Sequence, residues 1–226
     1  MQNSLKKRSN SKAIQKMTSL RSGVKLDLMK KLPTYLFLVF FSFSAPSFAE
    51  DISEYQIEGI SIGDSLLNHL SKEKIITEIE INKSTYNYLN DDFGEVYLFG
   101  NFDTYDRLSF FVKPKDKHYT IYSIYGSISY DDKLKQCFAK QKKIEKEFSS
   151  KYKNAKKRKI TLEFDWDPTG ESVSHNIQFF FDSGDLSEVN CTKYKKSFKI
   201  KNNWVDSLQV SFAKKEVFDW FSKPRN

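Results

Sequence analysis

The sequence predicts an α+β fold, in which antiparallel strands form one or more sheets packed by one long helix and by short flanking helices. Residues 131–152 place apolar side chains at helical spacing, whereas runs such as 160–166 alternate apolar and polar residues. Clean alternation is typical of antiparallel strands with one wet face. A helical segment followed by strand-like runs occurs twice, so the fold can consist of two helix-then-strands halves.

The entrance to the first half lies at the sequence GISIGDS, residues 59–65. Asp64 or Ser61 is expected to cap a short helix that carries Leu66, Leu67 and Leu70 on one side. Strand-like runs follow at 95–100, 107–113 and 119–130, with turns between them.

The second half opens with the clearest helix pattern in the chain, from Asp131 or Asp132 to about Tyr152. Its apolar arc also contains Gln141, whose amide needs hydrogen-bond partners if that side is buried. A strand is expected over 159–166, where Ile160, Leu162, Phe164 and Trp166 share one side. A hairpin around Ser183–Gly184 follows. A strand at 207–212 and a final amphipathic turn complete the half.

The net charge of +8 is confined to the front of the chain. Residues 1–49 hold nine Lys or Arg and one acidic residue, whereas residues 50–226 hold 28 basic and 28 acidic residues. A strongly basic domain would suggest a nucleic-acid partner, and a neutral one does not. Nucleic acid is therefore not expected as a partner.

The front itself is typical of an export signal. Residues 1–28 form a basic extension, which a gene model that starts before Met29 would also produce. Residues 29–49 form a signal peptide, because an apolar core follows Lys30 and Lys31, and small residues occupy 47 and 49. Cleavage is expected between Ala49 and Glu50, which leaves 50–226 as a single exported α+β domain, periplasmic or secreted. The membrane would be met only through the signal segment before cleavage; a retained anchor is the alternative.

The only two cysteines, Cys137 and Cys191, both follow the signal. An even count in an oxidising compartment suggests a bridge. Cys137 lies on the apolar side of the predicted helix, and Cys191 shares a side of its strand with Val189. A helix lying on the sheet would bring both sulfurs to one interface. The alternative is two buried thiols that never meet.

Ser61 stands in a G-x-S-x-G pattern, which a serine hydrolase uses to present its nucleophile. That nucleophile sits in a parallel α/β sheet and is followed by an acid and a histidine. Here the serine precedes any strand that would support it, and only His69, His118 and His175 are available as bases. We therefore expect Ser61 to cap backbone or to face solvent, and a small serine hydrolase remains an unfavoured alternative.

No residue is assigned a catalytic, cofactor-binding or metal-binding role, and no cofactor is expected. Asp165, Asp167 and Gly170 resemble a calcium loop only faintly, and a turn explains them better. Tyr119, Tyr125 and Phe111 suggest a stacking platform for a sugar or peptide, although strand propensity also accounts for them. The basic cluster 151–159 is expected at a solvated helix end, with an acidic partner or acidic headgroups as the alternative.

The segment YQIEGISIGDSLLNHLSKEKI resembles the opening of small exported α+β domains of the BamE/SmpA and β-lactamase-inhibitor-protein type. The missing lipobox cysteine departs from the lipoprotein members of that group. The chain from residue 50 onwards is also similar to uncharacterised exported proteins of AT-rich bacteria. These resemblances imply location and fold class, but no activity.

We expect an exported binding protein and not an enzyme. Residues 50–130 carry a net charge of −7 and residues 131–226 one of +7, so the surface is expected to be asymmetric in charge. The partner is expected to be another exported or envelope protein, bound through the open face of the sheet or through this asymmetric surface. A carbohydrate- or lipid-binding module is the main alternative. The sequence leaves the oligomeric state undetermined.

Overall fold

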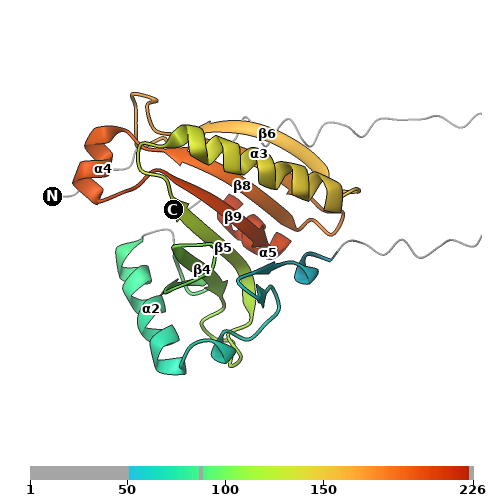
Figure 1. Ribbon diagram of the computed structural model, residues 1–226. Coiled ribbons are helices and arrows are strands. Elements are labelled where there is room, and N and C mark those ends of the chain that lie inside the picture. Colours follow the sequence, from blue (N-terminus) through green and yellow to red (C-terminus); the bar gives the residue numbers. More distant parts are fainter. Residues whose placement is uncertain (1–50, 87–88, 224–226) are drawn as a thin grey trace, which may run out of the picture. The chain divides into compact units, whose positions relative to one another are not determined.

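A computed structural model describes residues 51–86 and 89–223 (Figure 1). The basic extension 1–28, the signal peptide 29–49 and the cleavage point between Ala49 and Glu50 lie outside the described residues. The predictions about export processing therefore stay predictions.

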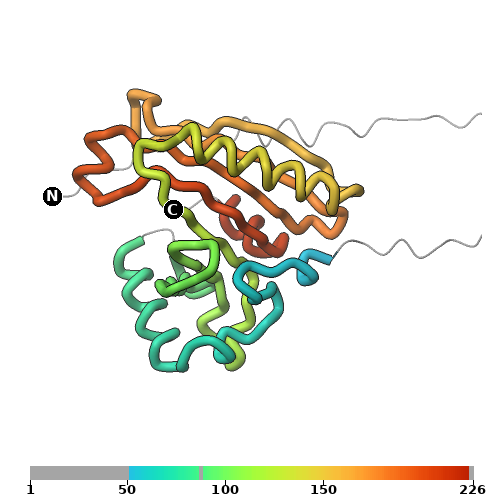
Figure 2. The backbone as a smooth tube through the Cα atoms, viewed as in Figure 1, coloured from blue at the N-terminus to red at the C-terminus, as the bar shows by residue number. Residues whose placement is uncertain are grey.

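Seven antiparallel strands form the main sheet, in the order β3-β4-β5-β9-β8-β7-β6. Two runs of strands start at the outer edges, β3 and β6, and meet where β5 pairs with β9. Figure 2 shows the two runs as separate parts of the chain, the first in green and the second in orange to red. The strands are β3 (Gly94–Phe99), β4 (Arg107–Val112), β5 (Ile121–Ser129), β6 (Lys156–Glu163), β7 (Val173–Phe180), β8 (Leu186–Lys193) and β9 (Ser207–Ala213).

Helices cover the two faces of this sheet unequally. The long helix α3 (Leu134–Lys151) and the helix α2 (Lys72–Thr85) bury their apolar residues in one core with the sheet, whereas α5 (Lys215–Ser222) joins a smaller cluster on the opposite face. We call these the α3 face, which carries Val189 and Val210, and the α5 face, which carries Asn190 and Gln209. The predicted α+β class is confirmed.

Each run of strands follows a helix, as the sequence suggested. Helix α2 precedes β3–β5, and α3 precedes β6–β8; the short helix α4 (Lys196–Asn202) then leads to β9. The hairpin around Ser183–Gly184 is also confirmed, with the Gly184 amide donating to the Phe181 carbonyl at 2.9 Å. Gly184 has φ of +86°, a conformation that favours glycine at this turn.

The apolar side of α3 is the side that the sequence predicted. Cys137, Gln141 and Ile144 are buried, and the Gln141 amide donates to the carbonyls of His175 (2.6 Å) and Val189 (3.0 Å). These bonds supply the partners that a buried amide needs. The predicted start at Asp131 or Asp132 is too early, because Asp132 has φ of +56° and the helix begins at Leu134.

Two helices were not predicted. Helix α2 buries only Ile75, Ile79 and Asn82, while several other β-branched residues on it face solvent, so its sequence shows no clear apolar arc. Ser71, which caps it by accepting from the Lys74 amide at 3.3 Å, was the available signal. Helix α4 has only seven residues and no buried ones.

The first short helix and the strand at 159–166 need correction. Residues Leu66–Asn68 form a 3₁₀ turn, η2, capped by Ser65 and not by Asp64 or Ser61. The strand β6 runs from Lys156 to Glu163, so Phe164 and Trp166 lie beyond it. Their alternation continues after the chain has left the sheet, because the two rings stack on each other at 4.8 Å.

A small hairpin and a second 3₁₀ turn precede these elements. They are η1 (Ile52–Glu54), β1 (Gln56–Ile57) and β2 (Ile60–Ser61). Their isoleucines join the core on the α3 face.

Candidate functional site: the groove between α3 and β6

Cys137 and Cys191 form a disulfide, with their Cα atoms 6.0 Å apart. Both residues are fully buried, one on α3 and one on β8. The predicted bridge is therefore present, and a disulfide is typical of an oxidising compartment. It also fixes α3 to the strand two places in from the edge β6.

Ser61 lies in the two-residue strand β2 and is 7 % exposed. The expectation that it caps backbone or faces solvent is wrong, because Ser65 is the cap and Ser61 is buried. Its backbone amide donates to the Asp64 carboxylate at 2.8 Å. The described residues show no hydrogen bond between its hydroxyl and any histidine: His118 and His175 bond to Ser65 and Thr161 instead.

The segment around Asp167 is a tight turn. The Asp167 carboxylate accepts the amides of Thr169 (3.1 Å) and Ser172 (2.8 Å), and the Gly170 amide donates to the Asp167 carbonyl. Burial alone would raise the pKa of Asp167, but the hydrogen bonds from Ser172 and Thr169 hold it well below its usual value. The carboxylate therefore serves the turn itself.

The suggested stacking platform does not exist. Phe111 is fully buried under α5, where it packs against Trp220, whereas Tyr119 belongs to the core on the α3 face. Tyr125 does contact Phe111, at 5.8 Å between ring centroids, and its hydroxyl donates to the buried Glu95 carboxylate. These three rings are structural.

The basic cluster 151–159 spans more than a helix end. Lys151 closes α3, but residues 156–159 form the first half of β6. Because β6 is the last strand of the sheet, its outer edge pairs with no described strand. All of its residues except Ile160 are exposed, so the edge is open as well as cationic.

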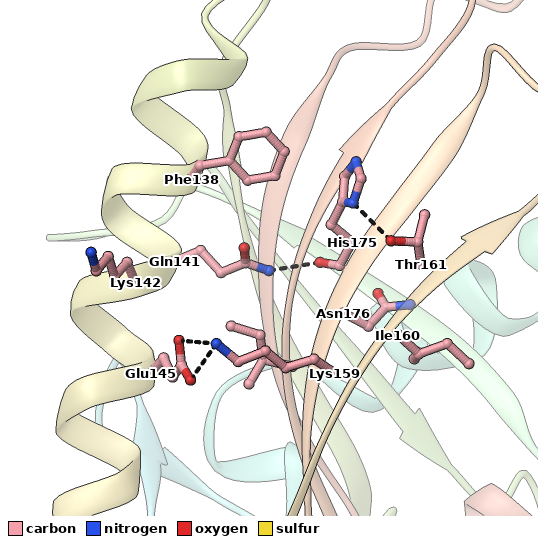
Figure 3. Close-up of a pocket in the computed structure, with 10 residues that line it drawn as sticks. Phe138, Gln141, Lys142, Glu145, Lys159, Ile160, Thr161, His175 and Asn176 are labelled. Atoms are coloured by element: carbon pink, nitrogen blue, oxygen red, sulfur yellow. Dashed lines mark hydrogen bonds and ion pairs between the residues drawn. The ribbon is translucent and has the colours of Figure 1, made fainter.

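A groove of about 440 Å³ separates this strand from α3 (Figure 3). Helix α3 lies over β8 and β9, and the groove opens between it and the outer strands β7 and β6. The groove is lined by Phe138, Gln141, Lys142 and Glu145 of α3, by Lys159, Ile160 and Thr161 of β6, and by His175, Asn176 and Ile177 of β7.

Each wall of the groove is held by specific contacts. Glu145 bridges from α3 to Lys159 (2.7 Å) and Lys157 (3.1 Å) on β6. The His175 ring lies 3.0 Å from the Thr161 hydroxyl and packs edge-on against Phe138, at 5.1 Å between ring centroids. Figure 3 shows Phe138 and His175 above the Gln141 amide and the Glu145–Lys159 pair below it. The groove thus has an apolar end and a charged end.

The charged end is electropositive. Burial would raise the pKa of Glu145, but hydrogen bonds from Lys159 and Lys157 outweigh it and lower the pKa. One carboxylate faces two ammonium groups, and Lys142 makes no ion pair with any described residue. Lys156 and Arg158 lie on the α5 face of β6, where Arg158 interacts electrostatically with Glu188 of β8. The strand β6 as a whole therefore carries a net positive charge.

Metal sites and membrane-spanning helices are not evident in the described part of the chain. Among those residues, no three His, Cys, Asp or Glu side chains lie close enough to hold a metal ion. None of the described helices is long and apolar enough to cross a membrane. Comparison of the chain with family models, curated proteins and solved structures finds no match. The resemblance of the entrance segment to exported α+β domains thus stays a prediction.

Sequence reasoning found the basic residues of this site but not the site. The charge run was visible as KYKNAKKRK, yet its place at a sheet edge depends on the order of strands far apart in the chain. The apolar end is formed by Phe138 and His175, which meet only because α3 packs on the second run.

Proposed function

We propose that this chain is an exported, non-enzymatic protein-binding module, periplasmic or secreted. Its partner would be an acidic, extended segment of another exported or envelope protein, which adds as a strand to the open edge of β6. The observation that carries this proposal is an eight-residue cationic strand whose outer edge pairs with no described strand, beside a groove of about 440 Å³.

Strand addition fits the backbone chemistry of this edge. An edge strand presents a row of N–H and C=O groups that a second extended chain can bond. Main-chain hydrogen bonds supply affinity in this mode, and pockets for alternate side chains supply specificity. A strand added to β6 would direct every second side chain to the α3 face, where the groove opens between α3 and β6.

The charges favour an acidic partner over a second copy of the same edge. Pairing two copies of β6 would place lysines near lysines, and like charges opposite each other destabilise a strand pair. Lysines at an edge also guard against non-specific pairing. An acidic segment turns the same charges into an attraction that speeds encounter and selects the partner.

Export is supported by the disulfide and by the signal-like N-terminus. Disulfides persist in oxidising compartments such as the periplasm or the extracellular space. The region from residue 50 onwards is neutral overall, so the positive edge is a local feature and not part of a generally basic surface.

Fluorescence anisotropy of labelled peptides tests the proposal. The probes are an eight-residue peptide that alternates glutamate with valine and its counterpart that alternates lysine with valine. We expect the acidic peptide to bind and the basic one not to bind, with affinity falling as salt rises because exposed charges are screened. Hydrogen exchange should slow within β6 when the acidic peptide is bound.

A double charge reversal locates the interaction. Lys156→Glu with Arg158→Glu should weaken binding about tenfold, because two attractions become repulsions of up to about 1 kcal/mol each. The matched control, Lys72→Glu with Lys117→Glu, reverses two exposed charges elsewhere and should change little. Equal binding of both peptides, or an unaffected double reversal at β6, would overturn the proposal.

A further inference from the structure

A second pocket lies on the other face of the sheet, away from the groove. Its volume is about 260 Å³, and its floor is formed by β4, β5 and β9 on the α5 face. The lining residues used below are Arg107, Ser127, Ser129, Gln209, Tyr194 and Trp204. By register, Arg107, Ser127 and Gln209 stand side by side across three strands.

The wall of this pocket is aromatic and is built by the end of α4. Asn203 adopts φ of +55° after α4, and the Trp204 amide then donates to the Lys199 carbonyl at 3.1 Å. This turn places Trp204 against Tyr194 and Trp166, at 5.0 and 5.1 Å between ring centroids. Trp204 remains 38 % exposed, so one part of the indole is supported by packing and another is available to a ligand.

The floor contains two buried polar atoms without partners. Among the described residues, the Ser127 hydroxyl and the Arg107 Nε have no hydrogen-bond partner, and Ser127 is only 7 % exposed. Leaving such a group unpaired costs about 1–3 kcal/mol, so an orphaned pair in one pocket calls for an explanation. The Arg107 guanidinium stacks over the Tyr97 ring at 5.0 Å, and Arg107 also lines the pocket.

Arg107 makes no ion pair with a described residue, although two aspartates lie near. Asp206 accepts the Tyr194 amide and the Lys199 ammonium. Asp106, which also lines the pocket, accepts the Ser129 amide at 2.6 Å and keeps its negative charge. The Arg107 guanidinium is therefore free to bind a carboxylate, with one acidic side chain beside it.

These features match one ligand chemistry. A guanidinium recognises a carboxylate through two parallel hydrogen bonds. The exposed indole offers an apolar face to a ring, and hydroxyls and amides, here of Ser127, Ser129 and Gln209, bond to neighbouring polar groups. The volume of about 260 Å³ lies just below the usual range of ligand pockets, about 300–1,000 Å³, so the pocket suits no more than a single ring.

We propose that this pocket binds a sugar acid, with its carboxylate on Arg107 and its ring against Trp204. This site is separate from the β6 groove and does not depend on the function proposed for that groove. The sugar hydroxyls meet Ser127 and Gln209, which gives the buried Ser127 hydroxyl the partner that it lacks.

Titration calorimetry with glucuronate, glucose and acetate tests the ligand class. We expect glucuronate to bind most tightly, acetate more weakly because it lacks the ring, and glucose most weakly because it lacks the charge. Glucose binding as tightly as glucuronate, or no binding of glucuronate, would overturn the proposal. Acetate matching glucuronate would also overturn it, because the indole would then have no role.

Arg107→Gln should weaken glucuronate binding at least about tenfold, as expected for the loss of a charge-assisted bidentate contact. Its matched control is Arg158→Gln, which removes an arginine from the same face outside the pocket. Trp204→Ala should weaken binding, whereas Ile200→Ala, at an exposed residue of α4, should not. Equal losses in a variant and its control would contradict the assignment.

Ser127→Ala separates function from folding. Removing an unpaired buried hydroxyl should leave the melting temperature unchanged or raise it, while glucuronate binding weakens. A purely structural role for Ser127 predicts a lower melting temperature with binding intact, which is the opposite result.

Discussion

The two edge strands of the main sheet, β3 and β6, differ in how their unpaired backbone groups are treated. At β3, helix α2 lies along the edge and bonds to its backbone: Asn82 donates to the Glu95 carbonyl at 2.9 Å, and Glu78 accepts the Tyr97 amide at 3.4 Å. At β6 no described element does this, and the strand carries lysines instead. One edge is sealed and the other is open, which marks β6 as the edge available for a partner.

The seal at β3 depends on close packing. A side chain at Gly94, the first residue of β3, would meet the Ile79 side chain at 2.8 Å, so only glycine lets α2 approach so closely. At the other edge, α3 stands away from β6. The contacts between them include the ion pairs of Glu145 with Lys157 and Lys159 and a hydrogen bond from Lys157 to the Ser149 hydroxyl. The difference indicates that the space between α3 and β6 results from how the helices pack on the sheet.

Loss of the disulfide should have the largest effect on this contrast. Cys137→Ser or Cys191→Ser should each lower the free energy of unfolding by about 2–5 kcal/mol and loosen α3, which forms one wall of the groove. Urea denaturation measures the first effect, and anisotropy of the acidic peptide measures the second. The double variant should be no worse than either single one; additive losses would contradict a single shared bond.

Removing a hydrogen bond between α2 and the β3 edge should have the next largest effect on the free energy of unfolding. Asn82→Ala leaves the buried Glu95 carbonyl without this donor and should lower the free energy of unfolding by about 1–3 kcal/mol. The matched change at the open edge, Thr161→Ala, affects an exposed side chain and should stay within about 0.5 kcal/mol. Similar losses at both positions would remove the distinction between the edges.

The link between α3 and the open edge should be sensitive to acid. The pKa of folded Glu145 is lowered from its ordinary value of 4.5, so its contribution to stability is present above that value and is lost as pH falls through the lowered one. Glu145→Gln should therefore destabilise the protein by up to about 1 kcal/mol at pH 7. Denaturation at pH 3 should show a smaller difference; a constant difference would assign the loss to packing.

Ser61→Ala should change the free energy of unfolding least. Ser61 lies in β2 and belongs to neither edge of the main sheet. Its hydroxyl makes no cap, because Ser65 performs that role at the neighbouring turn, so the loss should not exceed about 1 kcal/mol. Thermal denaturation measures it. Covalent labelling of Ser61 by a fluorophosphonate probe would revive the hydrolase alternative.

Sequence reasoning succeeded where one face of an element is broad and apolar. The side of α3 that carries Cys137 was predicted, and with the strand alternation around Val189 this was enough to place the disulfide. It failed for α2, because a helix that lies along an edge needs only a narrow stripe: Ile75, Ile79 and Asn82. A stripe of that width does not produce the pattern by which helices are recognised.

The candidate sites were even less visible in the sequence. The alternation of apolar and polar residues runs on past Glu163 to Trp166, so the predicted strand was too long. Nothing in the local sequence shows that Phe164 and Trp166 instead pack with rings from the α4 region. Strand order likewise makes β6 an edge strand and places Arg107 beside Ser127. Strand order is set by pairings between distant segments, which no short stretch of residues records.

The position of β9 has a consequence for how the chain folds. It is the last of the described strands along the chain, yet it joins the two runs, pairing with β5 on one side and β8 on the other. Until residues 207–213 are available, the chain can form only two separate three-stranded sheets, with β5 and β8 as bare inner edges. Pairings between distant segments form slowly, and such edges are prone to aggregate in the interval. A chain truncated before β9 should therefore depend on chaperones, and residues 207–213 decide when the seven-stranded sheet can be completed.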